Sequence, residues 1–168
     1  FRDLASGRPQ PVGLEIAVNL WTQAVDGEIG DLAPQGTPSP EPDSTAIDEA
    51  AALIAAARAP MIVVGGGAQD DAEAIQALAR RIGAPVVAFR TGHGVMPSDD
   101  PLSIGMPMAH SLWPDTDLVI GLGTRLQSQV MSWGRDEAMK IIHIDIDETQ
   151  IGRSAPVDIG IHARLADA

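Results

Sequence analysis

Four short segments of this sequence are rich in glycine or in polar and charged residues, and each follows a run of apolar residues. They are Gly65-Gly66-Gly67, "RTGHG" (90–94), "GLGTR" (121–125) and "HIDID" (143–147). Glycine lets a backbone approach a ligand closely, and the amides at a helix start can donate to a phosphate. Arg125 could add a bidentate phosphate contact, and Asp145 could accept hydrogen bonds from ribose hydroxyls. Together these segments predict a nucleotide pocket.

Each segment also has a simpler interpretation. Three glycines after a strand more often form a tight turn, and "GGGAQD" departs from the dinucleotide-binding pattern G-x-G-x-x-G at Asp70. Asp145 and Asp147 would point to the same face of a strand and could bind a hard cation, although such residues more often cap a loop or meet solvent. The four histidines have no metal-ligand spacing, and the sequence shows no catalytic constellation.

The elements before these segments must position them, and the apolar pattern predicts alternating strands and helices. Thr45 and Asp48 form a pair like a capping box, which begins a helix that Pro60 stops. A second helix is predicted from residue 70 to Gly83, and a third over 107–113. Strands are predicted at 61–64, 86–89, 117–123, 140–147 and 157–161.

Strands that alternate with helices imply a parallel sheet with right-handed crossovers. The predicted fold is therefore α/β, a doubly wound, mostly parallel sheet with helices on both faces, which is Rossmann-like and similar to FAD/NAD-binding domains. In such sheets ligands bind beyond the carboxyl ends of the strands, where the four segments are expected to lie.

The first 45 residues differ in pattern from the rest. Residues 11–18 alternate with a period of two, which predicts a half-buried strand. Prolines 34, 38, 40 and 42 favour extended backbone, so residues 21–45 are predicted to be a linker or an ordered loop. Residues 46–168 form the predicted nucleotide-binding-like domain. The chain begins without methionine and ends as a helix would open, so we expect an excised fragment.

Charge and composition argue against several classes of partner. The net charge of −12 repels phosphate backbones and anionic lipid, and no apolar run approaches the roughly 20 residues that span a bilayer. We therefore expect neither nucleic acid nor a membrane as a partner. The sequence has no cysteine, which excludes disulfides and thiolate metal sites and fits a cytoplasmic protein.

Five motifs, in order and spacing, resemble the central domain of thiamine-diphosphate-dependent enzymes of the acetolactate synthase type. They are "SGRPQPVGLEIAVNLW", "AALIAAARAPMIVVGGGA", "LARRIGAPVVAFRTGHGVMPSDDPLSIGM", "DTDLVIGLGTRL" and "KIIHIDIDETQIGRS". The resemblance covers nearly the whole chain. It implies a subunit of three α/β domains, of which this is the middle one and residues 1–20 are the last strand of the domain before it.

The resemblance also implies where the chemistry occurs. In that family thiamine diphosphate sits between the first and third domains, across a subunit interface, in a homo-oligomer. The catalytic glutamate belongs to the first domain and the Mg²⁺ motif to the third, and this sequence contains neither. We expect no catalysis by the chain alone, and a whole enzyme that makes or breaks carbon–carbon bonds of 2-keto acids as a transferase or lyase.

The middle domain of several relatives binds a structural FAD or ADP, whereas in others it is a cofactor-free scaffold for assembly. Carried over by motif, the implied contacts are Gly65 and Gly66 with diphosphate or ribose, Gly105 and Met106 with the flavin, Gly123, Thr124 and Arg125 with phosphate, Asp145 and Ile146 with adenosine, and Arg8 with phosphate. The sequence departs from FAD-binding members at Gln127, at Pro107-Met108 and at Ile161-His162.

Overall fold

The computed structural model describes residues 4, 7–24, 26–27, 30 and 38–168. It divides into two units, Phe1–Pro38 and Ser39–Ala168, which are considered separately below. Part of the predicted linker, at residues 25, 28–29 and 31–37, lies outside the described residues. Among those described, no helix is long and apolar enough to cross a bilayer.

The strand predicted for residues 11–18 does not form in this chain. Residues 11–17 are not in a strand, and Val18–Leu20 is a 3-10 turn, η1. The apolar side chains of the segment are exposed, with Leu14 at 85% and Val18 at 84%. A strand needs a neighbour for its backbone hydrogen bonds, and no described residue pairs with this segment. Its assignment to a preceding domain stays a prediction.

The second unit contains a six-stranded sheet in which every pairing is parallel. The strands are β1 (Pro60–Val64), β2 (Val86–Ala88), β3 (Ser103–Ile104), β4 (Leu118–Leu122), β5 (Lys140–Asp145) and β6 (Ile159–His162). Their order is β3-β2-β1-β4-β5-β6. This order confirms the predicted doubly wound sheet, and its direction of winding reverses between β1 and β4.

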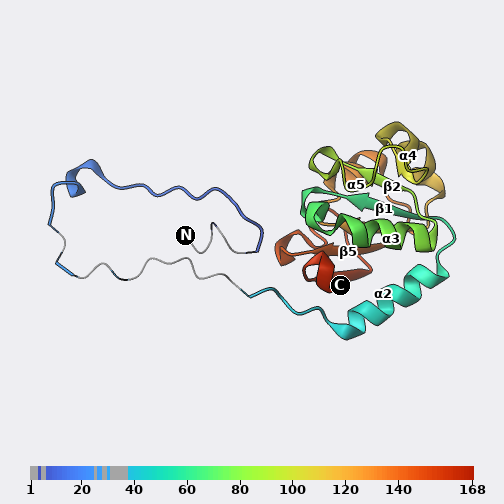
Figure 1. Cartoon of the computed structure of the whole chain (residues 1–168), viewed down its shortest axis with the longest axis horizontal. Coiled ribbons are helices and arrows are strands. Elements are labelled where there is room, and N and C mark those ends of the chain that lie inside the picture. The colour runs from blue at the N-terminus through green and yellow to red at the C-terminus, as the bar shows by residue number, and fades with distance from the viewer. Residues whose placement is uncertain (1–3, 5–6, 25, 28–29, 31–37) are drawn as a thin grey trace. The chain divides into compact units, whose positions relative to one another are not determined.

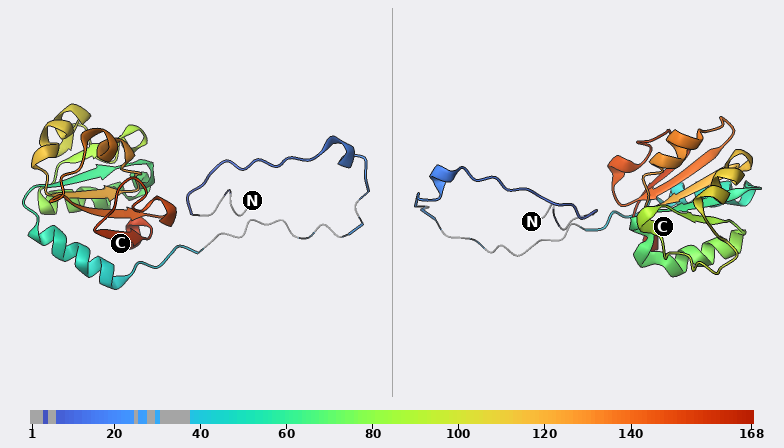
Figure 2. Two further views of the ribbon diagram at one scale, coloured as in Figure 1. Left: turned by 180° about the vertical axis from the view of Figure 1, so that it is seen from behind. Right: turned by 90° about the horizontal axis from the view of Figure 1, so that it is seen from above.

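Helices cover both faces of the sheet, as the alternation of elements predicts (Figure 1). On one face α2 (Ser44–Ala56) and α3 (Ala72–Ile82) pack over the side chains of alternate strand residues, including Ile62 and Ile120. On the other face α4 (Met106–Leu112) and α5 (Gln127–Trp133) pack over the intervening residues, including Val63 and Val119. Figure 2 shows the sheet between these two layers.

The structure revises several local predictions. Asp43, and not the Thr45–Asp48 pair, caps α2, because its side chain accepts from the Thr45 amide. Asp70 and Asp71 belong to a 3-10 turn, η2 (Gly66–Asp71), that precedes α3. The end of α3 is as predicted, since Gly83 has a φ of +66° in the left-handed region that favours glycine. The sequence pattern did not reveal β3 or α5, which are short.

Candidate functional site

The glycine turn after β1 packs against the loops of both neighbouring strands. A Cβ built on Gly65 would lie 2.4 Å from the carbonyl oxygen of Gly123, in the loop after β4. On Gly66 it would lie 2.7 Å from Oγ1 of Thr91, in the loop after β2. The glycine turn therefore touches the loop on each side of it, and glycine is needed here because no side chain fits at these contacts.

Backbone hydrogen bonds fix this contact. The Gly65 amide donates to Leu122 O at 3.1 Å, and the Gly67 amide donates to Gly123 O at 3.1 Å. The Gly123 amide donates in turn to Ile144 O at 3.0 Å. These three amides are therefore occupied within the fold, so phosphate contacts at this edge would fall to other amides and to side chains.

The loop after β4 places one predicted residue inside the protein and one outside. Thr124 is buried, and its carbonyl lies 2.7 Å from Nε2 of His143. Since a carbonyl only accepts, the histidine carries its proton on Nε2. Arg125 is exposed, and its own carbonyl accepts from the Ser154 hydroxyl at 2.9 Å. The backbone of Arg125 is thus anchored while its guanidinium faces solvent.

His143 is a buried group that the sequence did not single out for this role. It is 2% exposed and pairs across the ladder with Gly121. Burial lowers the pKa of its imidazole, while the bond to Thr124 and the charge of Asp145 offset part of that effect. Since β4 and β5 pair here, the neutral imidazole helps to hold the β4 loop that carries Arg125.

The acidic segment after β5 forms local turns. Asp145 is 7% exposed, and its Oδ1 accepts from the Asp147 amide at 2.9 Å. Asp147 caps the following 3-10 turn through the Thr149 amide. The carbonyl of Ile146, also a predicted contact, accepts from Nε2 of His162 at 3.0 Å. Both carboxylates accept hydrogen bonds from backbone amides two residues further on, so the two aspartates serve as turn formers. Among the described residues no group of three or more potential metal ligands occurs.

The remaining predicted contacts lie elsewhere. Gly105 precedes α4 and Met106 begins it, after the edge strand β3. Met106 packs against the core of the α4–α5 face, with its Sδ 4.0 Å from Nε2 of Gln129. Arg8 is in the unit Phe1–Pro38. Of the predicted residues, the structure therefore brings together Gly65, Gly66, Gly123, Thr124, Arg125, Asp145 and Ile146, at the carboxyl ends of three adjacent strands.

A small cavity lies beside this edge, between the β4 loop and the chain that crosses from β5 to β6. Its volume is about 10 Å³, and its lining includes Arg125, His143 and Ser154. That volume holds no more than about one water molecule. The cavity is therefore too small to hold a nucleotide.

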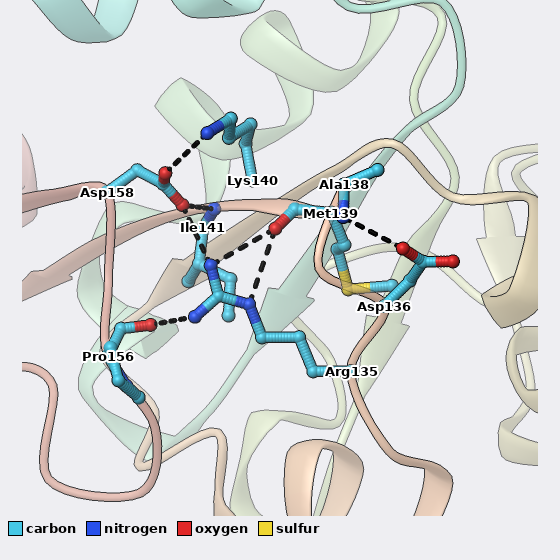
Figure 3. A network of polar contacts seen from close by, with 8 residues as sticks. All are labelled: Arg135, Asp136, Ala138, Met139, Lys140, Ile141, Pro156 and Asp158. Carbon is cyan, nitrogen blue, oxygen red and sulfur yellow. Dashed lines mark hydrogen bonds and ion pairs between the residues drawn. The ribbon is translucent and has the colours of Figure 1, made fainter.

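The crossover from β5 to β6 is held by an arginine that the sequence analysis did not identify (Figure 3). Arg135 donates through Nε and Nη2 to Met139 O and through Nη1 to Pro156 O, and Nη2 lies 3.1 Å from Asp158 Oδ2. Asp158 also accepts from Lys140 Nζ at 3.0 Å and from the Ile141 amide at 2.9 Å. The cluster fixes the far end of the loop whose Ser154 anchors Arg125.

Asp158→Asn tests the strength of this cluster. Burial alone raises the pKa of Asp158, but the bonds from Lys140 and Ile141, with the charges of Lys140 and Arg135, outweigh it and lower the pKa. Removing the charge should reduce the free energy of unfolding by about 1 kcal/mol, less in high salt. Urea denaturation measures this loss. Asp99→Asn, at an exposed residue, is the matched control, and equal stability of the two variants would contradict the prediction.

A family model and several curated proteins match this chain, and they agree with one another. Residues 47–168 match the family model described as thiamine pyrophosphate enzyme, central domain. The chain is 30% identical to the large subunit of acetolactate synthase isozyme 1 from Escherichia coli (strain K12), over 99% of the chain and 31% of that protein. It is 36% identical to sulfoacetaldehyde acetyltransferase from Rhodobacter capsulatus, over 91% of the chain and 28% of that protein.

A third relative is glyoxylate carboligase from Escherichia coli O157:H7, which is 31% identical over 96% of the chain and 29% of its own length. The chain thus spans about three-tenths of the length of these curated relatives.

Proposed function

The chain belongs to the thiamine pyrophosphate enzyme central-domain family, and from that premise we propose that it is the nucleotide-binding middle domain of an enzyme that makes or cleaves carbon–carbon bonds of 2-keto acids. Thiamine diphosphate, with Mg²⁺, would be held by flanking domains of a homo-oligomer and would supply the carbanion-stabilising chemistry. The chain itself would bind a structural adenine nucleotide and would not catalyse the reaction.

The observation that carries the proposal is the convergence of loops where the sheet reverses its winding. Ligands of open α/β sheets bind at this point. Here the exposed Arg125 follows Gly123 and Thr124, which pack against Gly65. The neighbouring strand, β5, ends in the buried Asp145. A guanidinium suits a phosphate, and a carboxylate suits ribose hydroxyls. These residues fit the ADP portion that ADP and FAD share.

The fit to a flavin is weaker. Gln127, which replaces an acidic residue of FAD-binding members, is the exposed first residue of α5. Ile161-His162 stands where FAD-binding members often have Gly-Asp, and the imidazole of His162 donates a hydrogen bond to Ile146 O. Pro107, at another position that departs from FAD-binding members, follows Met106 in the first turn of α4. ADP is therefore the better supported ligand of the two.

A second candidate function is a cofactor-free scaffold, and one observation favours it. The packing of Gly65 and Gly66 against neighbouring loops accounts for these glycines without any ligand. Under this alternative the loops would serve only to build the domain and to meet flanking domains.

Calorimetric titration of the whole chain with ADP and with FAD separates the two functions. We expect ADP to bind, and Arg125→Gln to weaken binding about tenfold because it removes a charge-assisted hydrogen bond. FAD that binds more tightly than ADP would show that the flavin is also recognised. The absence of binding at millimolar concentrations of either nucleotide would favour the scaffold.

A further inference from the structure

The loop after β2 is rigidly held although its side chains are exposed. Nε2 of Gln69, in η2, donates to Thr91 O at 2.6 Å and to His93 O at 2.9 Å. Gly92 is buried, and a Cβ on it would lie 2.4 Å from Val64 O. Two carbonyls are thus fixed from one side and the middle of the loop is pressed against the end of β1. The loop presents Arg90, Thr91 and His93 to solvent in a fixed conformation.

Arg90 has an unusual backbone in this loop. Its φ is +46°, in the left-handed region that residues other than glycine rarely adopt. Such strained residues concentrate at binding sites, where the surrounding structure holds them. The guanidinium carbon lies 5.1 Å from the centre of the Phe89 ring, and the guanidinium makes no ion pair or hydrogen bond with the residues that the structure describes. Stacking orders the group while leaving its N–H edge available.

The sheet order places Arg90 and Arg125 on opposite sides of the glycine turn. Arg90 follows β2 and Arg125 lies just beyond β4, and both strands flank β1. Neighbouring strands lie about 4.8 Å apart, so the ends of β2 and β4 are separated by roughly 10 Å. Two long side chains starting at that separation can reach one diphosphate between them. The contact of Thr91 with Gly66 shows that the loop after β2 adjoins the glycine turn.

We infer that Arg90 is a second phosphate-binding residue, which holds the diphosphate of the nucleotide from the side opposite Arg125; this rests on the proposed nucleotide-binding function. The charge of the protein gives a reason for two arginines. The chain carries a net charge of −12, and Asp70 and Asp71 lie in η2 after the glycine turn. An anionic ligand at this edge therefore needs concentrated positive charge.

Calorimetric titration of the whole chain with ADP and with adenosine tests this role. Arg90→Gln should raise the Kd for ADP about tenfold and leave the Kd for adenosine unchanged, because adenosine has no phosphate. Arg90→Lys, which keeps the charge, should raise the Kd for ADP by only about threefold. Arg58→Gln is the matched control, since Arg58 is exposed and lies before β1, at the opposite edge of the sheet. It should leave both affinities unchanged.

The outcomes distinguish this inference from the proposed function. If the parent chain binds ADP but Arg90→Gln binds it as tightly as Arg58→Gln does, Arg90 has no phosphate role and the nucleotide site stands. Equal weakening of ADP and adenosine binding by Arg90→Gln would also overturn the inference, because it indicates a role in loop structure. If the parent chain binds no ADP, both the site and the role of Arg90 are refuted.

Discussion

Gly65→Ala is expected to reduce the free energy of unfolding by about 3 kcal/mol, at the upper end of the usual cost of overpacking. The new methyl carbon would lie 2.4 Å from Gly123 O and 2.8 Å from Thr124 Cα, and both are backbone atoms that cannot rotate away. The clash can be relieved only if the loops after β1 and β4 separate. Their separation would stretch the hydrogen bonds from Gly65 to Leu122 and from Gly67 to Gly123. Urea denaturation followed by circular dichroism measures the loss.

Gly105→Ala provides the control within the same domain. Its Cβ would lie no closer than 3.7 Å to another atom, Cδ of Pro107, and its backbone is extended with a φ of −78°. This variant should stay within about 0.5 kcal/mol of the parent chain, as for most surface changes. Equal stability of Gly65→Ala and Gly105→Ala would contradict the close packing of the loops after β1 and β4.

The tight packing at Gly65 shows what the sequence could and could not predict about the site. The glycine triplet after an apolar run predicts a turn, and the structure has one. Its partners, Gly123 and Thr91, follow other strands, so only the order of the strands brings them together. A motif at one strand end carries no information about the packing of the neighbouring loop. The same holds for Gln69, whose bonds to the β2 loop join distant segments.

The fold was more predictable than the site because its signals are local. Buried parallel strands such as Leu118–Leu122 are continuous apolar runs, and the amphipathic pattern of Ala72–Ile82 gives α3 directly. The two-residue β3 and the seven-residue α5 are too short to show a period. The alternation over residues 11–18 is a true strand pattern, but a strand also needs a neighbour, which no described residue provides.

The second large effect is a loss of folding stability in mild acid. His143 is buried and neutral, and burial lowers the pKa of its imidazole below the ordinary value of 6.5. The unfolded chain therefore binds a proton at a higher pH than the folded protein does. Stability from this group is complete above about pH 6.5 and is lost as pH falls from there toward the folded pKa. The slope for one proton is at most about 1.4 kcal/mol per pH unit.

Urea denaturation at a series of pH values should therefore show a decline in stability that begins below about pH 6.5 and that His143→Gln removes. The glutamine can keep a hydrogen bond to Thr124 O but cannot be protonated. Lowered pKa values also make Asp100, Asp117 and Asp158 sources of acid sensitivity, but theirs begins only near 3.8 and below. The two pH windows are separate. His93→Gln, at an exposed histidine, should keep the decline. A decline that persists in His143→Gln would mean that another group senses acid in this range.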